Sequence, residues 1–171
     1  MTGPGLVHLY TGSGKGKTTA AMGLALRALG RGKRVVIVQF LKSGDTGEVP
    51  LLESLGATVF RGKAGQKFTF QMNGEELAET RRLQTANLAA ALDIPCDLLV
   101  LDEACAACRK GLVEEDLLRA AVLEKPDERE VVLTGRDPAP WMVDAADYIT
   151  EMNARRHPFE KGISAREGVE Y

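Results

Sequence analysis

Short apolar runs alternate with longer stretches of helical periodicity along most of the chain. The apolar runs predict strands at residues 6–10, 34–40, 57–61, 98–101, 130–134 and 148–152. The stretches between them predict helices over residues 18–29, 51–55 and 73–92 and around Cys105 and Leu117. Asn73 is a predicted N-cap, and Glu76 stands where its side chain can reach back to the cap.

The order of these elements predicts an α/β fold. Strands that alternate with helices favour a mostly parallel sheet with helices on both faces and right-handed crossovers. The run VVIV within residues 34–40 is typical of a strand that is covered on both faces. A chain of 171 residues, 44% of them apolar, has the size of one domain, so we expect residues 1–171 to form a single domain.

Two segments depart from the alternating pattern. Residues 62–72 carry glycines, lysines and two phenylalanines, which predicts a loop with exposed aromatic side chains. Residues 154–171 carry Pro158, two glycines and several charges, which predicts an irregular tail along the surface. A tail of this length in a compact domain usually has a function.

The charge balance limits the possible partners. Lysine and arginine number 22 against 24 acidic residues, so no net positive field favours nucleic acid or an anionic membrane surface. No apolar run approaches the roughly 20 residues that span a bilayer, and the first ten residues lack a signal-peptide pattern. We therefore expect a soluble, cytoplasmic protein that binds neither nucleic acid nor membranes.

The three cysteines suggest packing rather than chemistry. An odd number argues against a disulfide framework and fits a reducing compartment. Cys105 and Cys108 form a C-x-x-C pair, but zinc needs two further ligands, and neither His8 nor His157 stands at a suitable spacing. We interpret the pair as small apolar residues that let a helix pack closely.

The segment Thr11–Thr19 reads TGSGKGKTT and joins the first predicted strand to the first predicted helix. In a phosphate-binding loop, glycines let backbone N–H groups point at a polyphosphate, and a lysine and the helix dipole add positive charge. Lys17 supplies the cation, and Thr18 places a hydroxyl where Mg²⁺ is held. Threonine at position 11 replaces the glycine of the strict pattern, so the loop is a variant. We expect it to bind ATP through Gly12, Ser13, Gly14, Lys15, Gly16, Lys17 and Thr18.

Further charged residues are expected at the same edge of the sheet. Asp102 and Glu103 follow a buried strand in the manner of a Walker B motif, so either carboxylate can help Thr18 to hold the metal. Arg136 follows the strand at 130–134, and its planar fork can bind phosphate. Arg27, near the C-terminal end of the first helix, either contacts ATP or simply favours the helix dipole.

These motifs alone indicate only a protein that uses ATP or GTP, because one fold hosts many chemistries. A kinase or ATPase would use Glu103 to activate a hydroxyl or a water and would release ADP or orthophosphate. A nucleotide-dependent regulatory module would bind ATP and a protein partner without consuming either. Both remain alternatives at this point.

Six segments, in order, resemble the CobA-type ATP:corrinoid adenosyltransferases: GSGKGKTTAAMGLALRALGRGKRV, IVQFLKSG, the F-T-F loop, LLVLDE, VVLTGRD and HPFEKGISAREGVEY. The resemblance runs through nearly the whole chain, and a generic P-loop ATPase has no reason to carry that ending. It implies a RecA-like fold and a reaction in which Co(I) of a corrinoid, either cobalamin or a precursor, attacks the 5′ carbon of ATP. Inorganic triphosphate then leaves. It also implies a homodimer and a flavin-type electron donor that reduces Co(II) to Co(I).

The resemblance also implies roles for single residues. Lys15, Lys17 and Arg136, together with Mg²⁺ or Mn²⁺, would neutralise the leaving triphosphate. Phe68 and Phe70 match aromatic positions that occupy the lower face of the corrin; the alternative is that both are core residues on one face.

The chain departs from the family pattern in three places. Phenylalanine stands at position 70 and serine at position 13, where a family representative has tryptophan and the family commonly has asparagine. That representative also has an N-terminal helix that closes the site, whereas here the first predicted strand begins at Leu6. We expect another segment, such as the tail, to close it.

Overall fold

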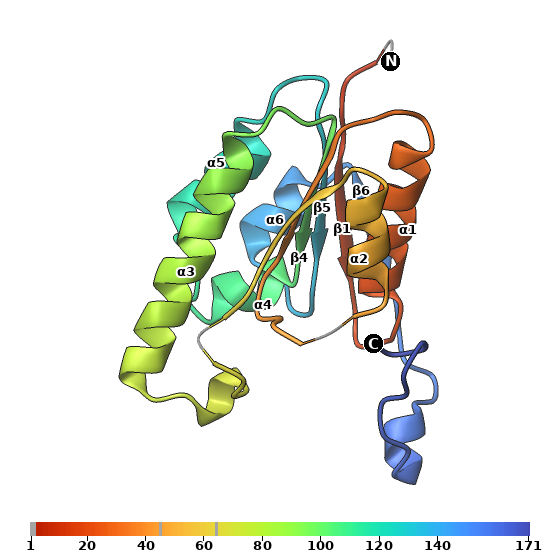
Figure 1. Cartoon of the computed structure of the whole chain (residues 1–171), viewed down its shortest axis with the longest axis vertical. Coiled ribbons are helices and arrows are strands. Elements are labelled where there is room, and N and C mark those ends of the chain that lie inside the picture. Colours follow the sequence, from red (N-terminus) through yellow and green to blue (C-terminus); the bar gives the residue numbers. More distant parts are fainter. Residues whose placement is uncertain (1–2, 45, 64) are drawn as a thin grey trace.

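The computed structural model describes residues 3–44, 46–63 and 65–171. Its centre is a parallel sheet with the strand order β3-β2-β4-β5-β1-β6 (Figure 1). The strands are β1 (Val7–Thr11), β2 (Val35–Gln39), β3 (Thr58–Arg61), β4 (Leu98–Asp102), β5 (Glu130–Thr134) and β6 (Tyr148–Glu151). The predicted α/β fold is confirmed.

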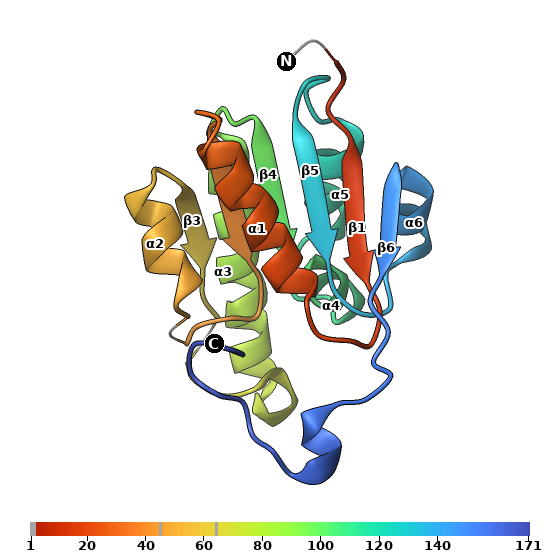
Figure 2. The same cartoon turned by 90° about the vertical axis from the view of Figure 1, so that its right-hand side faces the viewer.

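Helices cover both faces of the sheet, as predicted. The α-helices are α1 (Lys17–Leu29), α2 (Glu48–Ser54), α3 (Gly74–Leu92), α4 (Ala104–Arg109), α5 (Glu115–Leu123) and α6 (Pro140–Ala145). Two 3-10 helices, η1 (Thr69–Gln71) and η2 (Pro158–Lys161), lie in the aromatic loop and in the tail. Figure 2 shows α1 and α2 on one face and α3, α4 and α5 behind the other. Among the described residues, no helix combines the length and the apolar character needed to traverse a bilayer.

Each face of the sheet has its own core. In β2, Val36 and Val38 pack into the core beneath α3 to α6, whereas Val35 and Ile37 pack into the core beneath α1 and α2. Successive side chains of a strand point to opposite faces, so the run VVIV serves both cores. All five residues of β2 are buried, which confirms a strand covered on both sides.

The aromatic loop is fixed to the start of α3. The Oδ1 atom of Asn73 accepts from the N–H of Glu76, and Oε2 of Glu76 accepts from the N–H of Asn73, each at 2.9 Å. This reciprocal cap is the one that the sequence predicted. Lys67 donates to the other oxygen of Glu76 at 2.7 Å and lowers the pKa of that carboxyl. The cap therefore also holds the segment just before η1.

Two helices differ from the sequence prediction. The helix expected at 51–55 begins at Glu48, because Pro50 lies in the first turn, where a missing N–H breaks no helical hydrogen bond. Helix α6 was not predicted at all. It has only six residues, too few for a helical period to show in the sequence, and it begins at Pro140.

Cys105 packs against the end of β5 at unusually close range. Gly135 follows that strand with φ of 141°, and a Cβ added there would lie 2.6 Å from Cβ of Cys105. The Cys105 side chain is fully buried, and burial raises the pKa of its thiol to about 12. An unreactive thiol in this position supports the interpretation of the C-x-x-C pair as a packing feature.

We expect Gly135→Ala to lower the free energy of unfolding by about 2–4 kcal/mol, because alanine is strained at this φ and would overlap Cys105. Gly23→Ala in α1 is the matched control, since a Cβ at Gly23 has no neighbour within 4 Å. Alanine there should stabilise the protein by roughly 0.5–1 kcal/mol. Urea denaturation measures both variants, and a Gly135→Ala variant as stable as the parent would contradict the packing described.

Candidate active site

The phosphate-loop residues 12–16 connect β1 to α1 at the carboxyl edge of the sheet (Figure 2). The N–H of Gly14 donates to the carbonyl oxygen of Met152 at 2.6 Å. A Cβ at Gly12 or Gly14 would lie 2.4 or 2.8 Å from that same oxygen. The chain that leaves β6 thus supports the outer side of the loop, and it requires glycine there independently of any phosphate.

Lys17 is the first residue of α1, and its side chain reaches back into the phosphate loop. Its Nζ atom donates to the carbonyl oxygens of Gly12 at 2.9 Å and Gly14 at 2.6 Å. Burial lowers the pKa of the Lys17 ammonium, and the nearby charge of Arg136 lowers it further. A cation that has only neutral carbonyls for partners gains strongly from an anion placed beside it.

Asp102 is completely buried and accepts hydrogen bonds on both carboxylate oxygens. Its Oδ1 atom accepts from the hydroxyls of Thr18 at 2.8 Å and Thr134 at 2.7 Å. Its Oδ2 atom accepts from Nε2 of Gln39 at 3.2 Å and from Nζ of Lys42 at 2.6 Å. The carboxylate therefore links α1, β2 and β5 directly beneath the phosphate loop.

Glu103 follows Asp102, and its side chain lines a cleft above the phosphate loop. Its φ of 61° is in the left-handed region, and its N–H donates to the Thr134 hydroxyl at 2.9 Å. Burial raises the pKa of the Glu103 carboxyl, and the charge of Asp102 adds to this effect. A strained backbone that aims a carboxylate into a cleft is typical of a functional position.

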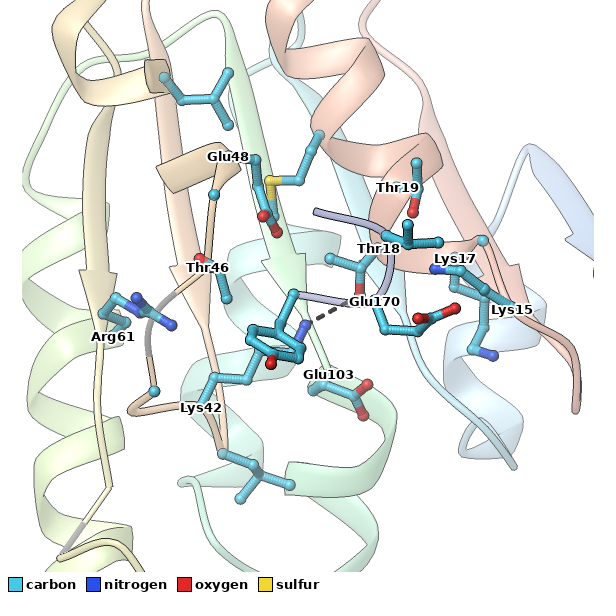
Figure 3. Close-up of a pocket in the computed structure, with 18 of the residues that line it drawn as sticks. Lys15, Lys17, Thr18, Thr19, Lys42, Thr46, Glu48, Arg61, Glu103 and Glu170 are labelled. Atoms are coloured by element: carbon cyan, nitrogen blue, oxygen red, sulfur yellow. Dashed lines mark hydrogen bonds between the residues drawn. The ribbon is translucent and has the colours of Figure 1, made fainter. Parts of the chain in front are cut away.

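A cleft of about 1110 Å³ opens above these residues. Figure 3 shows Lys15 and Lys17 on one side of it, Arg61 on the other, and Lys42 between them. The connection from β2 to α2 and the end of the tail complete its wall. The predicted site residues that line it are Gly14, Lys15, Gly16, Lys17, Thr18, Phe68, Glu103 and Arg136.

Five predicted residues lie outside this lining: Gly12, Ser13, Arg27, Phe70 and Asp102. Ser13 accepts from the N–H of Ala154 at 3.2 Å and so joins the loop to the start of the tail. Arg27 is exposed in the last turn of α1, and its charge acts on Tyr10. This position agrees with the helix-dipole interpretation, and a contact of Arg27 to ATP stays a prediction.

The two phenylalanines are exposed, so the alternative that both are core residues is wrong. Phe68 and Phe70 have exposed fractions of 63% and 81%. Their rings stack with centroids 5.5 Å apart and planes 6° from parallel, and Lys63 lies over the Phe68 ring at 5.3 Å. Solvent-exposed stacked rings offer an apolar surface to a large flat ligand.

The oxygen atoms at the loop fit a magnesium ion. No group of three or more His, Cys, Asp or Glu in the described part of the chain could hold a metal alone. Mg²⁺ needs no such group, because it binds through one or two carboxylates, waters and substrate phosphates. The Lys42 ammonium lies 2.6 Å from Asp102 Oδ2 and 3.1 Å from Thr18 Oγ1, which marks this point as suited to a cation.

Lys42 was not predicted as a site residue, whereas the tail was expected to close the site. Lys42 follows β2, whose register pairs Gln39 with Asp102, so the same sheet-edge argument would find it once β2 is known to neighbour β4. Residues 168–171 line the cleft. The guanidinium of Arg166 donates hydrogen bonds to the Glu170 carboxylate at 3.2 Å. Those bonds, and to a smaller extent the charge of Lys15, lower the pKa of Glu170.

Comparison with known proteins identifies the relatives of this chain. The family model for the ATP:corrinoid adenosyltransferase BtuR/CobO/CobP matches residues 4–171. The corrinoid adenosyltransferase of Pseudomonas aeruginosa is 36% identical over 98% of this chain and 84% of its own length, and that of Escherichia coli K12 is 32% identical over 98% and 86%. A KaiC-like protein from Pyrococcus horikoshii shares the fold, with a TM-score of 0.54 and 17% identity over 90% of this chain and 75% of that one. The chain belongs to the family of ATP:corrinoid adenosyltransferases.

Proposed function

We propose that this protein transfers the 5′-deoxyadenosyl group of ATP to Co(I) of a corrinoid and releases inorganic triphosphate. The observation that carries the proposal is one cleft that is lined both by Lys15 and Lys17 and by Phe68, whose exposed ring stacks on that of Phe70. In the reaction, the electron pair of Co(I) forms a bond to C5′, and the C5′–O5′ bond breaks. Its electrons leave on the triphosphate, and the cobalt becomes Co(III).

The leaving group gains negative charge as the bond to C5′ breaks, so cations at the triphosphate stabilise the transition state. Lys15, Lys17 and Arg136 line the cleft and are the groups that we propose for this role. Lys17 has only carbonyl partners and can exchange them for phosphate oxygens. Because the nucleophile is the cobalt, no serine, cysteine or histidine of the chain need attack ATP.

Mg²⁺, or Mn²⁺, would be held by Thr18, Asp102 and Glu103. The ion would neutralise part of the triphosphate charge. The Thr18 hydroxyl and the Asp102 carboxylate are already 2.8 Å apart, and Glu103 faces the same cleft. Asp102 is also anchored by Thr134 and Gln39, so its oxygens are held in place before a ligand arrives.

Phe68 and Phe70 are proposed to pack against the lower face of the corrin. Reduction to Co(I) becomes easier when the lower axial ligand is removed, and aromatic rings at that face would keep out both the ligand and water. Phe68 itself lines the cleft, which supports a corrin position next to the phosphate loop. The tail supports closure of the site, because residues 168–171 already reach the cleft.

We also propose an electron donor, a cellular location and an oligomeric state for this protein. Co(I) formation needs an electron donor, for which a flavin-type reductant has suitable chemistry. The three free thiols fit a cytoplasmic protein. A homodimer is supported by β6, an edge strand whose Tyr148 and Ile149 are 51% and 52% exposed, because a second copy could cover these side chains.

A kinase or ATPase is the second candidate. It is favoured by Glu103, whose carboxylate faces the cleft and could orient a water or a hydroxyl. The two functions differ in their products, since a kinase or ATPase releases ADP or orthophosphate and forms no cobalt–carbon bond.

We expect Lys17→Ala to lower the rate of adenosyl transfer by about 10²–10³-fold, because the leaving triphosphate loses its central cation. The assay combines protein, Mg-ATP and chemically reduced corrinoid without oxygen, and it follows a light-sensitive cobalt–carbon product together with triphosphate. Arg31→Ala is the control, since Arg31 is exposed just beyond α1 and is not among the residues that line the cleft. Release of ADP or orthophosphate without a corrinoid product would overturn the proposed function.

We expect Phe70→Ala to raise the KM for the corrinoid by about 10-fold or more, as burial of an aromatic ring is worth roughly 1.5–3 kcal/mol. The KM for ATP should not change. Phe159→Ala in the tail is a matched control, because Phe159 is 79% exposed and Phe70 is 81% exposed, but Phe70 stacks on the cleft-lining Phe68 and Phe159 does not. Equal effects of the two substitutions on the corrinoid KM would argue against a corrin contact at Phe70.

A further inference from the structure

Lys42 occupies the point at which the metal ion is expected. Its Nζ atom donates to Asp102 Oδ2 at 2.6 Å and to Thr18 Oγ1 at 3.1 Å. The Thr18 hydroxyl in turn donates to Asp102 Oδ1 at 2.8 Å, which closes a small ring of charge and hydroxyl. The ammonium therefore contacts two of the three groups that are proposed to bind Mg²⁺, Thr18 and Asp102.

The backbone holds Lys42 in this position. The N–H of Phe40 donates to the carbonyl oxygen of Asp102 at 3.0 Å, which continues the pairing of β2 with β4. Leu41 has φ of 62° and donates its N–H to Oε1 of Gln84 at 2.7 Å. Lys42 thus follows two residues whose backbone is hydrogen-bonded to β4 and to α3. This geometry makes the contact with Asp102 a feature of the fold and not a chance surface ion pair.

The pairing compensates a buried charge. The Asp102 side chain is 0% exposed, whereas that of Lys42 is 27% exposed. A carboxylate without water must be paired, because an unpaired buried charge is strongly destabilising. Lys42 supplies the only full positive charge among the four described side-chain donors to Asp102. Because Lys42 occupies Asp102 Oδ2, a divalent cation can bind that oxygen only if it displaces the ammonium.

The displaced ammonium needs a new anionic partner. Among the described residues, the cleft has six cationic side chains, Lys15, Lys17, Lys42, Arg61, Lys63 and Arg136, and three acidic ones, Glu48, Glu103 and Glu170. This excess of positive charge opposes the entry of a free divalent cation. The triphosphate of ATP reverses the balance, since its oxygens can accept from Lys42 once the metal takes Asp102.

We propose that Lys42 is a resident counter-ion that keeps Thr18 and Asp102 closed to a free metal, so that the divalent cation binds only together with the nucleotide. The proposal rests on the nucleotide part of the proposed function and not on the corrinoid. Lys42 acts as a positioning residue: it holds the metal ligands ready and afterwards moves to the phosphates. Metal and ATP affinities are then coupled reciprocally.

The test measures Mn²⁺ binding without nucleotide or corrinoid, from the loss of the electron paramagnetic resonance signal of free Mn²⁺. We expect the unmodified protein to show no saturable binding at millimolar Mn²⁺. Lys42→Gln and Lys42→Met should each bind Mn²⁺ at least about 10-fold more tightly than the unmodified protein does, because the carboxylate loses its competing cation. Lys42→Arg keeps the charge and should stay closed.

Two controls separate local exchange from the general field of the cleft. Lys63→Gln removes one positive charge from the same cleft without a contact to Asp102, so it should raise the Mn²⁺ affinity far less than Lys42→Gln does. Adding Asp102→Asn to Lys42→Gln should abolish the gained site. Circular dichroism melting curves confirm that each variant is folded. A rise of the melting temperature with Mn²⁺ in Lys42→Gln and Lys42→Met, but not in the unmodified protein, gives a second readout.

Equal Mn²⁺ affinity of the unmodified protein and Lys42→Gln would overturn the proposal. A gain for Lys63→Gln as large as that for Lys42→Gln would also overturn it, since only the net charge of the cleft would matter. Since no corrinoid is present, these outcomes are independent of whether adenosyl transfer occurs. A closed metal site together with a failed transfer assay would leave Lys42 as described and refute only the proposed reaction.

Discussion

The buried carboxylate of Asp102 is the constraint around which the site is built. A charge without water is tolerated only when donors surround it, and here Thr18, Thr134, Gln39 and Lys42 do so from three elements of the fold. These contacts fix the start of α1 against β4 and set the phosphate loop above the sheet. The same four donors also hold the carboxylate rigid, as its proposed role as a metal ligand would require.

The surrounding cleft is organised for anions. The Lys17 ammonium donates only to backbone carbonyls, and the Lys42 ammonium is paired with Asp102. The carbonyl of Met152 supports the outer side of the phosphate loop. An active site of this kind supplies charge neutralisation and position, while the bond-making electrons come from the corrinoid. Phe68 lines the cleft and stacks on Phe70, and we propose that this aromatic pair receives the corrin.

Local patterns were enough to predict much of this architecture. The apolar runs, the Asn73 cap and the glycine-rich loop are each predicted from a few neighbouring residues. Lys42 was missed because its role depends on which strand lies beside β4, and sequence periodicity does not give strand order. Alternation alone allowed Phe68 to be a core residue, since exposure depends on what packs above η1. Helix α6 was too short for a period to appear.

The most direct test of the account is the crystal structure of the protein with Mg-ATP and a Co(II) corrinoid. We expect the triphosphate in the loop beside Lys17, the metal in contact with Asp102 or Thr18, and the lower corrin face against Phe68 and Phe70. The C5′ atom should point at the cobalt. A γ-phosphate turned toward Glu103 with a water aligned behind it, and a corrinoid bound elsewhere or not at all, would contradict the account.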